Sequence, residues 1–126
     1  MNMKSVSLGS AILLALFSLS AHAADLPVKK VNGMLVDSKG MTVYTFDKDA
    51  AGSGKSACSG ACAQNWMPVM AGDATLASPY STVTRDDGSK QLAYHGKPLY
   101  TFVKDKKPGD KHGDKALNNA WHVVTD

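Results

Sequence analysis

The stretch GMTVYTFDKD, residues 40–49, occurs again as GKPLYTFVKD at residues 96–105. Six of the ten positions are identical, namely glycine, tyrosine, threonine, phenylalanine, lysine and aspartate. A tryptophan follows each copy at a similar distance, Trp66 the first and Trp121 the second. An internal repeat of this kind indicates that one structural unit is written twice in the chain.

Each copy has the composition of a β-strand, since valine and aromatic side chains favour an extended backbone. Alternation along residues 41–46 puts Tyr44 and Phe46 on one face of the strand and Val43 on the other. The aromatic faces of both copies and the two tryptophans are expected to form one shared core: Tyr44, Phe46, Trp66, Tyr100, Phe102 and Trp121. Each of these rings would bury about 150–250 Å². The halves should therefore pack on each other, because a lone hairpin is only marginally stable in water.

Two hairpins are predicted from turn signals. Asp37-Ser38-Lys39-Gly40 separates residues 33–36 from the strand at 41–46, and aspartate and glycine at those places suit a tight turn. An Asp-Gly pair at 86–89 separates two β-prone runs, residues 80–85 and 90–94.

The remaining residues complete an all-β (β-dominated) fold. Residues 97–102 and 120–125 are expected to be strands, and residues 104–119 a long polar loop rich in glycine and aspartate. A helical turn or two is possible within 57–65, but no segment shows a sustained 3.6-residue apolar period. The sequence predicts a single small domain over residues 33–126, built of half-repeats at about 33–70 and 80–125 from short antiparallel strands.

The N-terminus has the pattern of a signal peptide. A basic start precedes an apolar run at residues 6–19 and the small-x-small triplet Ala21-His22-Ala23. The run is shorter than the roughly 20 apolar residues that a membrane span needs, and no cysteine stands at the cleavage site to carry a lipid. We expect cleavage after Ala23, with residues 1–23 as signal peptide and 24–32 as a flexible lead-in. The mature protein is then expected to be soluble and periplasmic or secreted, without stable membrane insertion, although an uncleaved anchor is the alternative.

Charge argues against nucleic acid as a partner. The formal net charge of the whole chain is +3, whereas nucleic-acid binding rests on many clustered phosphate contacts. Lysines do cluster in the long loop, but three aspartates are interleaved with them, which is typical of a solvated polar loop: Lys104, Lys106, Lys107, Lys111 and Lys115, with Asp105, Asp110 and Asp114.

Cys58 and Cys62 are the only cysteines, in the sequence CSGAC. Two nearby thiols in an exported protein favour a disulfide. The three intervening residues do not fit a thioredoxin-like or c-type haem motif, and a structural zinc site would need four ligands. A disulfide here would pin the loop before Trp66 and contribute about 2 kcal/mol.

Other side chains could carry chemistry, but their spacing favours structural roles. Asp49 and Asp105 each follow a motif tyrosine by five residues, and the plain interpretation is that they accept backbone N–H groups of the next loop. A catalytic carboxylate pair is the alternative. No two histidines stand at metal-ligand spacing, so no metal or other cofactor is predicted, although a metal site is left open for His95, His112, His122, Met67 and Met70.

Taken together, the motifs resemble a known bacterial family, the secreted-repeat lipoproteins, which carry a repeated Tyr-x4-Asp motif. The first half matches as Gly-x-Thr-Val-Tyr-x-Phe-x-x-Asp over residues 40–49, followed by Cys-x3-Cys-Ala-x-Asn-Trp-x-Pro over residues 58–68. The second half matches at Arg85-Asp86-Asp87-Gly88, Gln91, Tyr94, Gly96, Pro98-Leu99-Tyr100, Asp105, Pro108-Gly109-Asp110, Gly113 and Trp121. The resemblance implies a small β-rich envelope domain and brings no established activity with it.

The sequence thus favours an exported, non-enzymatic binding or interaction module whose partner is an envelope protein or a small ligand. Two alternatives remain open, a metal- or redox-linked periplasmic protein and a hydrolase that uses Asp49 and Asp105.

Overall fold

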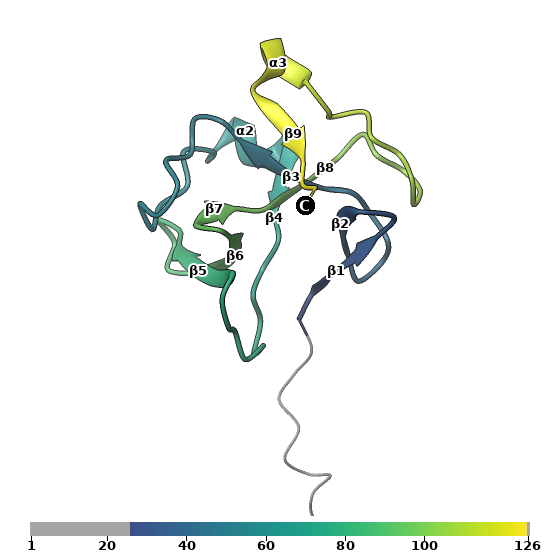
Figure 1. Ribbon diagram of the computed structural model, residues 1–126. Coiled ribbons are helices and arrows are strands. Elements are labelled where there is room, and N and C mark those ends of the chain that lie inside the picture. Colours follow the sequence, from purple (N-terminus) through teal and green to yellow (C-terminus); the bar gives the residue numbers. More distant parts are fainter. Residues whose placement is uncertain (1–25, 126) are drawn as a thin grey trace, which may run out of the picture.

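The computed structural model describes residues 26–125 (Figure 1). Within that range the protein is the small all-β domain that the sequence predicts, with nine short strands and two helices of no more than five residues. The predicted signal peptide, residues 1–23, lies outside the described residues. The strands are β1 (Val28–Val31), β2 (Met34–Asp37), β3 (Val43–Phe46), β4 (Trp66–Pro68), β5 (Tyr80–Thr84), β6 (Lys90–Tyr94), β7 (Lys97–Pro98), β8 (Tyr100–Phe102) and β9 (Trp121–Val123). The helices are α2 (Ala61–Asn65) and α3 (Ala116–Asn119).

A four-stranded antiparallel sheet, in the order β4-β8-β3-β9, forms the centre of the molecule. Its middle strands are the two copies of the repeat, and their tyrosines, Tyr44 and Tyr100, lie directly opposite each other. Two equivalent residues can face each other in an antiparallel pair only across a local two-fold axis. The two halves of the chain are therefore related by an approximate two-fold axis through the middle of this sheet.

The outer strands of the central sheet are exchanged between the halves. Strand β4 follows the first copy of the repeat but pairs with β8 of the second, so that Trp66 lies opposite Phe102. Strand β9 follows the second copy but pairs with β3 of the first, so that Trp121 lies opposite Phe46. Each half thus completes the sheet of the other.

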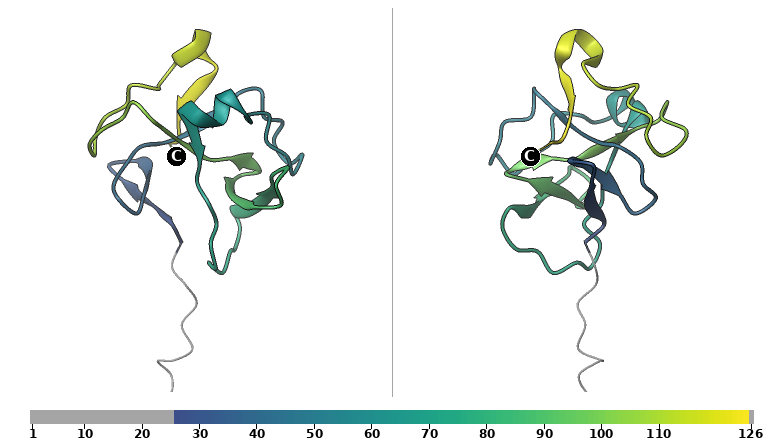
Figure 2. Two further views of the ribbon diagram at one scale, coloured as in Figure 1. Left: turned by 180° about the vertical axis from the view of Figure 1, so that it is seen from behind. Right: turned by 45° about the vertical axis from the view of Figure 1, so that its right-hand side comes forward.

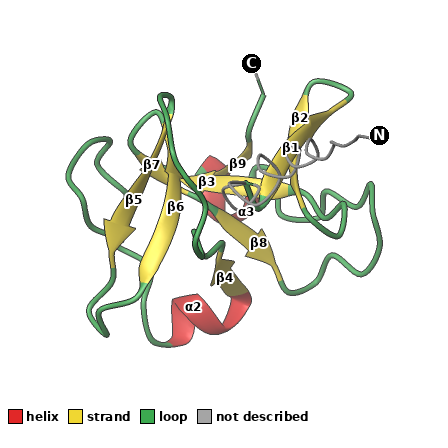
Figure 3. Cartoon of the chain, turned by 90° about the horizontal axis from the view of Figure 1, so that it is seen from below, coloured by secondary structure: helices red, strands yellow, loops and turns green. Residues whose placement is uncertain are grey.

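Two smaller sheets flank the central one on opposite sides (Figures 1 and 3). One is the hairpin β1–β2, and the other is the three-stranded sheet β5-β6-β7. The latter contains the predicted hairpin around residues 86–89, with Thr84 opposite Lys90. Helix α3 lies at one end of the molecule (Figure 2) and is a distorted turn, since Leu117 and Asn118 have positive φ.

Three local predictions are wrong. Residues 28–31, expected within the flexible lead-in, form β1 because β2 offers them a full antiparallel partner.

The hairpin predicted over 33–46 is reduced to one bridge between Val36 and Thr42. The turn is present, with the Asp37 carboxylate accepting the Lys39 and Met41 N–H groups at 2.9 Å each, but β2 pairs with β1 and β3 joins the central sheet. The strand predicted over 97–102 is divided at Leu99, where the chain passes from β7 to β8.

The central sheet has a different core on each face. Tyr44 and Phe46 point into the predicted aromatic core, together with Trp66, Tyr100 and Trp121. The opposite face carries an aliphatic core that includes Val43, Leu99, Val69, Val124, Leu35 and Leu92. The small flanking sheets cover this second face, so the hairpins contribute buried apolar area and not only turns.

The predicted disulfide between Cys58 and Cys62 is confirmed, with their Cα atoms 5.2 Å apart. It lies just before and inside α2, and Cys58 is fully buried against the aromatic core. The expected helical turns within residues 57–65 are also present, as α2. Among residues 26–125, no helix has the length and apolarity needed to cross a lipid bilayer.

Candidate functional site

The motif tyrosines and aspartates form two buried pairs that cross between the halves. The Tyr44 hydroxyl donates to Asp105 Oδ2 at 2.6 Å, and the Tyr100 hydroxyl donates to Asp49 Oδ2 at 2.6 Å. Both tyrosines are completely buried, and the aspartates are 3% and 6% exposed. Each motif is therefore completed by the aspartate of the other half, which follows from the exchange of strands around the two-fold axis.

The second oxygen of each aspartate holds the loop that follows it. Asp49 Oδ1 accepts the Ala57 N–H at 2.5 Å, and Asp105 Oδ1 accepts the His112 N–H at 2.9 Å. These are the backbone bonds that the plain interpretation of the sequence assigns to the two aspartates. Hydrogen bonds to a charged carboxylate stabilise a fold more than neutral ones do, so each pair fastens a long loop to the central sheet.

The two pairs have different neighbours. Tyr44 Oη accepts the N–H of Gly113 at 3.1 Å, and this glycine lies against Trp66. A Cβ at Gly113 would stand 2.6 Å from the Trp66 ring, so no larger residue fits without movement. Tyr100 Oη instead contacts the Ser56 hydroxyl at 2.6 Å.

Arg85 extends the Tyr100 side of the site. Its guanidinium donates to Ser56 Oγ at 3.1 Å, to Gln91 Oε1 at 2.7 Å and to the Cys58 carbonyl at 2.7 Å. Gln91 in turn donates to the Leu99 carbonyl at 2.7 Å. At the position equivalent to Gln91 the first half has an apolar residue, Met34, since Met34 bridges Thr125 as Gln91 bridges Met70. This polar network is therefore specific to one half, and it joins the disulfide loop to the β5–β6 hairpin.

Four rings form one stack, and the approximate two-fold axis crosses it between Trp66 and Trp121. Trp66 and Trp121 are nearly parallel, with centroids 3.7 Å apart. Phe46 stacks on the outer face of Trp121 at 4.2 Å, and Phe102 on that of Trp66 at 4.1 Å. Offset stacks and edge contacts of this kind stabilise a core beyond their buried area.

Burial raises the pKa of Tyr44, and the hydrogen bond to Asp105 raises it further. Burial, then the bond to Asp49, likewise raises the pKa of Tyr100. An unfolded tyrosine ionises near pH 10. Each tyrosine therefore contributes its full stability below about pH 10, and that contribution falls as the pH rises toward the folded-state pKa.

We expect alkaline solution to destabilise the protein in a manner that depends on these two hydroxyls. Above about pH 10 each tyrosine should lower the free energy of unfolding by up to about 1.4 kcal/mol per pH unit. Urea unfolding at pH 8.5, 10 and 11 measures this slope. Tyr44→Phe should remove about half of the tyrosine contribution, and an unchanged slope in that variant would contradict the assignment.

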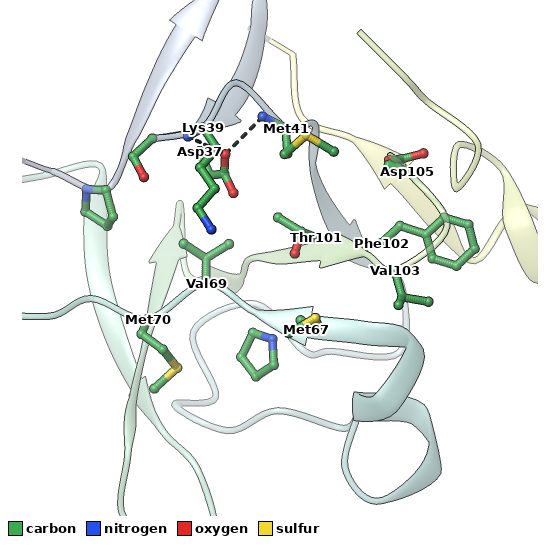
Figure 4. Close-up of a pocket in the computed structure, with 13 residues that line it drawn as sticks. Asp37, Lys39, Met41, Met67, Val69, Met70, Thr101, Phe102, Val103 and Asp105 are labelled. Atoms are coloured by element: carbon green, nitrogen blue, oxygen red, sulfur yellow. Dashed lines mark hydrogen bonds between the residues drawn. The ribbon is translucent and has the colours of Figure 1, made fainter. Parts of the chain in front are cut away.

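An open pocket lies beside the Tyr44–Asp105 pair, with a volume of about 440 Å³. Such a volume falls within the range of small-ligand sites. Figure 4 shows Lys39 and Met41 on one side, Met67 and Met70 on the other, and Thr101 between them. We call this pocket the methionine groove. Its apolar lining comes from Pro27, Met41, Met67, Pro68, Val69, Met70, Phe102 and Val103. The polar residues of the lining are Asp37, Ser38, Lys39, Thr101 and Asp105.

The methionine groove carries much of the exposed apolar surface of the described chain. Met67 is 51% exposed, Met70 40% and Val103 37%. Only Val31 and Leu117 are comparable large apolar residues among residues 26–125. Isolated exposed apolar residues are ordinary on protein surfaces, whereas grouped ones indicate an interaction site.

The three histidines within residues 26–125 lie apart from one another. His122 Nε2 lies 2.9 Å from Asp47 Oδ2, and the His95 ring contacts that of Tyr94 at 4.5 Å. His112 comes together with Asp105 and Asp110, one possible ligand atom of each lying within 4.8 Å of the others. Both carboxylates already accept backbone N–H groups there, so this cluster is a weak candidate for a metal.

Sequence reasoning missed the partners that only the tertiary structure brings to the site. Ser56, Arg85 and Gly113 come from loops and hairpins far from the tyrosines that they support. A comparison of the two halves could have singled out Gln91, because the equivalent residue of the first half, Met34, is apolar. Comparing equivalent residues of the two halves also singles out the methionine groove, because Met41, Met67 and Met70 correspond to Lys97, His122 and Thr125.

Comparison with known proteins gives one family. A family model described as a secreted repeat of unknown function matches residues 27–70 and 81–125, one match for each half. No curated protein and no solved structure matches the chain.

Proposed function

The chain belongs to the family of secreted repeats of unknown function, and from that premise we propose that it acts outside the cytoplasm as a binding module without catalytic activity. In this proposal the methionine groove receives a small ligand or a segment of an envelope protein. The two crossed tyrosine–aspartate pairs serve as the frame that holds the groove.

A difference between two equivalent surfaces carries the proposal. The approximate two-fold axis places Met67 opposite Thr101 in one half and His122 opposite Thr45 in the other. Around His122 the positions that correspond to Met41, Met70 and Val103 are polar or charged, namely Lys97, Thr125 and Asp47. The fold thus accepts polar side chains at these places, and an apolar groove in only one half is better explained by a bound partner than by packing.

The burial and hydrogen bonding of the two motif carboxylates support a role without catalysis. Asp49 and Asp105 are buried, and both oxygens of each already accept hydrogen bonds from the protein itself. A general base must reach the proton that it removes from a substrate, and these oxygens are already engaged by donors of the protein itself. The hydrolase alternative therefore has no particular observation in its favour.

Nuclear magnetic resonance with a library of small apolar fragments tests the proposal. Fragments should shift the amide signals of residues 37–41, 66–70 and 101–103, and Met67→Asp should abolish the effect. His122→Asp, the matched change in the other half, should leave fragment binding intact. Fragments that bind at His122 instead, or a sustained turnover that Asp49→Ala and Asp105→Ala remove, would contradict the proposal.

A further inference from the structure

We propose that the methionine groove binds a soft monovalent metal ion, Cu(I), through the thioether sulfurs of Met41, Met67 and Met70. This inference names the ligand class of the groove and so rests on the proposed binding function. Thioethers are soft donors and select Cu(I) over hard cations such as Mg²⁺ or Ca²⁺.

The residue type points to a metal more than to an apolar ligand. Leucine or valine would line a groove for a purely apolar molecule equally well. In the methionine groove, however, three exposed or half-exposed positions are methionine. Residues 26–125 contain one further methionine, Met34, which lines a different pocket. The methionines of the described chain are therefore concentrated at one site.

The methionines of the groove are accessible and flexible. Methionine is usually a buried residue, but Met67 and Met70 are 51% and 40% exposed. Met67 lies on the edge strand β4, Met70 follows two residues after its end, and Met41 precedes β3. The three side chains border one cavity from these segments (Figure 4). An unbranched side chain with three rotatable bonds can adapt its position to a ligand bound in the cavity.

The competing donors in the protein are few. Both cysteines are joined in the disulfide, so no thiolate is available to a soft ion. The cluster of Asp105, Asp110 and His112 lies nearby, but two of its three donors are carboxylates, which suit harder ions.

Lys39 is the one feature of the groove that opposes a cation. Its side chain extends from the turn toward Val69 (Figure 4), and a positive charge there repels another. The residue is exposed, so its flexible stem can move the ammonium group into water. Replacing Lys39 by glutamine should therefore tighten metal binding.

Titration of the purified full-length protein with Ag(I), a redox-stable substitute for Cu(I), tests the inference. One equivalent of silver nitrate in a chloride-free buffer should bind by calorimetry. In protein labelled at the methionine ε-methyl carbons, the signals of Met41, Met67 and Met70 should shift and that of Met34 should not. Anaerobic competition with a coloured Cu(I) chelator should then show the same site for Cu(I).

Conservative variants separate thioether ligation from apolar contact. The double variant Met67→Leu, Met70→Leu keeps the volume and apolarity of the groove and should weaken Ag(I) binding at least about tenfold, or about 1.4 kcal/mol. Met34→Leu and His112→Gln should bind Ag(I) as tightly as the parent. The double leucine variant should still bind the apolar fragments.

The outcomes are distinct. Unchanged Ag(I) affinity in the double leucine variant, a shift of Met34 equal to those of the others, or loss of binding in His112→Gln would each overturn the metal inference. If fragments bind the groove and Ag(I) does not, only the metal inference falls. If neither binds, the proposed function falls with it.

Discussion

Replacing Trp121 by alanine is expected to lower the free energy of unfolding by about 4 kcal/mol. The side chain is completely buried between Phe46 and Trp66, and its ring lies nearly perpendicular to that of Tyr100, with centroids 5.1 Å apart. Its removal breaks the four-ring stack in the middle and leaves a cavity that the paired strands cannot close. Domains have about 5–15 kcal/mol of stability in total, so this loss should bring the protein close to unfolding.

Urea unfolding followed by far-ultraviolet circular dichroism, with the disulfide intact, measures the effect. Trp66→Ala should cause a similar loss, because the two-fold axis gives both tryptophans the same place in the stack. Leu117→Ala is the control, since Leu117 is 68% exposed and such changes usually alter stability by less than about 0.5 kcal/mol. A loss below about 1 kcal/mol in either tryptophan variant would show that the stack is not the main core.

Tyr44→Phe and Asp105→Ala are each expected to lower the free energy of unfolding by about 2–3 kcal/mol. The phenylalanine leaves the Asp105 carboxylate without its hydroxyl donor and the Gly113 N–H without its acceptor. Because each single change already breaks the same bond, the double variant should lose about 1–2 kcal/mol less than the sum of the two.

The same cycle distinguishes crossed pairs from pairs within one motif. Tyr44 and Asp49 belong to one copy of the repeat but share no hydrogen bond, since Asp49 accepts from Tyr100. Tyr44→Phe combined with Asp49→Ala should therefore give a loss close to the sum of the single losses. A stronger coupling between Tyr44 and Asp49 than between Tyr44 and Asp105 would refute the crossed arrangement.

Features that depend on the local pattern could be predicted from the sequence. The alternation in YTF places Tyr44 and Phe46 on one face, and Asp-Gly marks the turn at 86–89, because side-chain direction and turn geometry depend on neighbouring residues. The close cysteine spacing likewise indicated the disulfide. The aromatic core followed from the repeat, since two copies of one apolar face can bury each other.

Features that depend on which strands pair could not be predicted. The turn at 37–40 forms as its residues dictate, yet β3 pairs with β8 and β9 along its two edges. In that position each face of β3 lies against one of the two cores. In the sequence Tyr44 stands five residues before Asp49, which suggests that these two residues belong together. The tertiary structure instead pairs Tyr44 with Asp105 and Tyr100 with Asp49. The methionine groove joins residues from three separate segments, and the sequence pattern of each segment alone gave no sign of it.

The exchange of strands has a consequence for how such a protein could arise. A gene encoding one copy would produce a chain that lacks a neighbour for its own tryptophan strand, so two such chains would have to meet before either could fold. Joining the copies through residues 71–79 makes that meeting intramolecular, at an effective concentration set by the linker and not by the amount of protein in the compartment. Fusion also allows the copies to differ, and here one surface is polar while its equivalent carries methionine. A third copy added to this chain would lack an equivalent copy with which to exchange its tryptophan strand, so longer relatives built on the same plan should carry even numbers of copies.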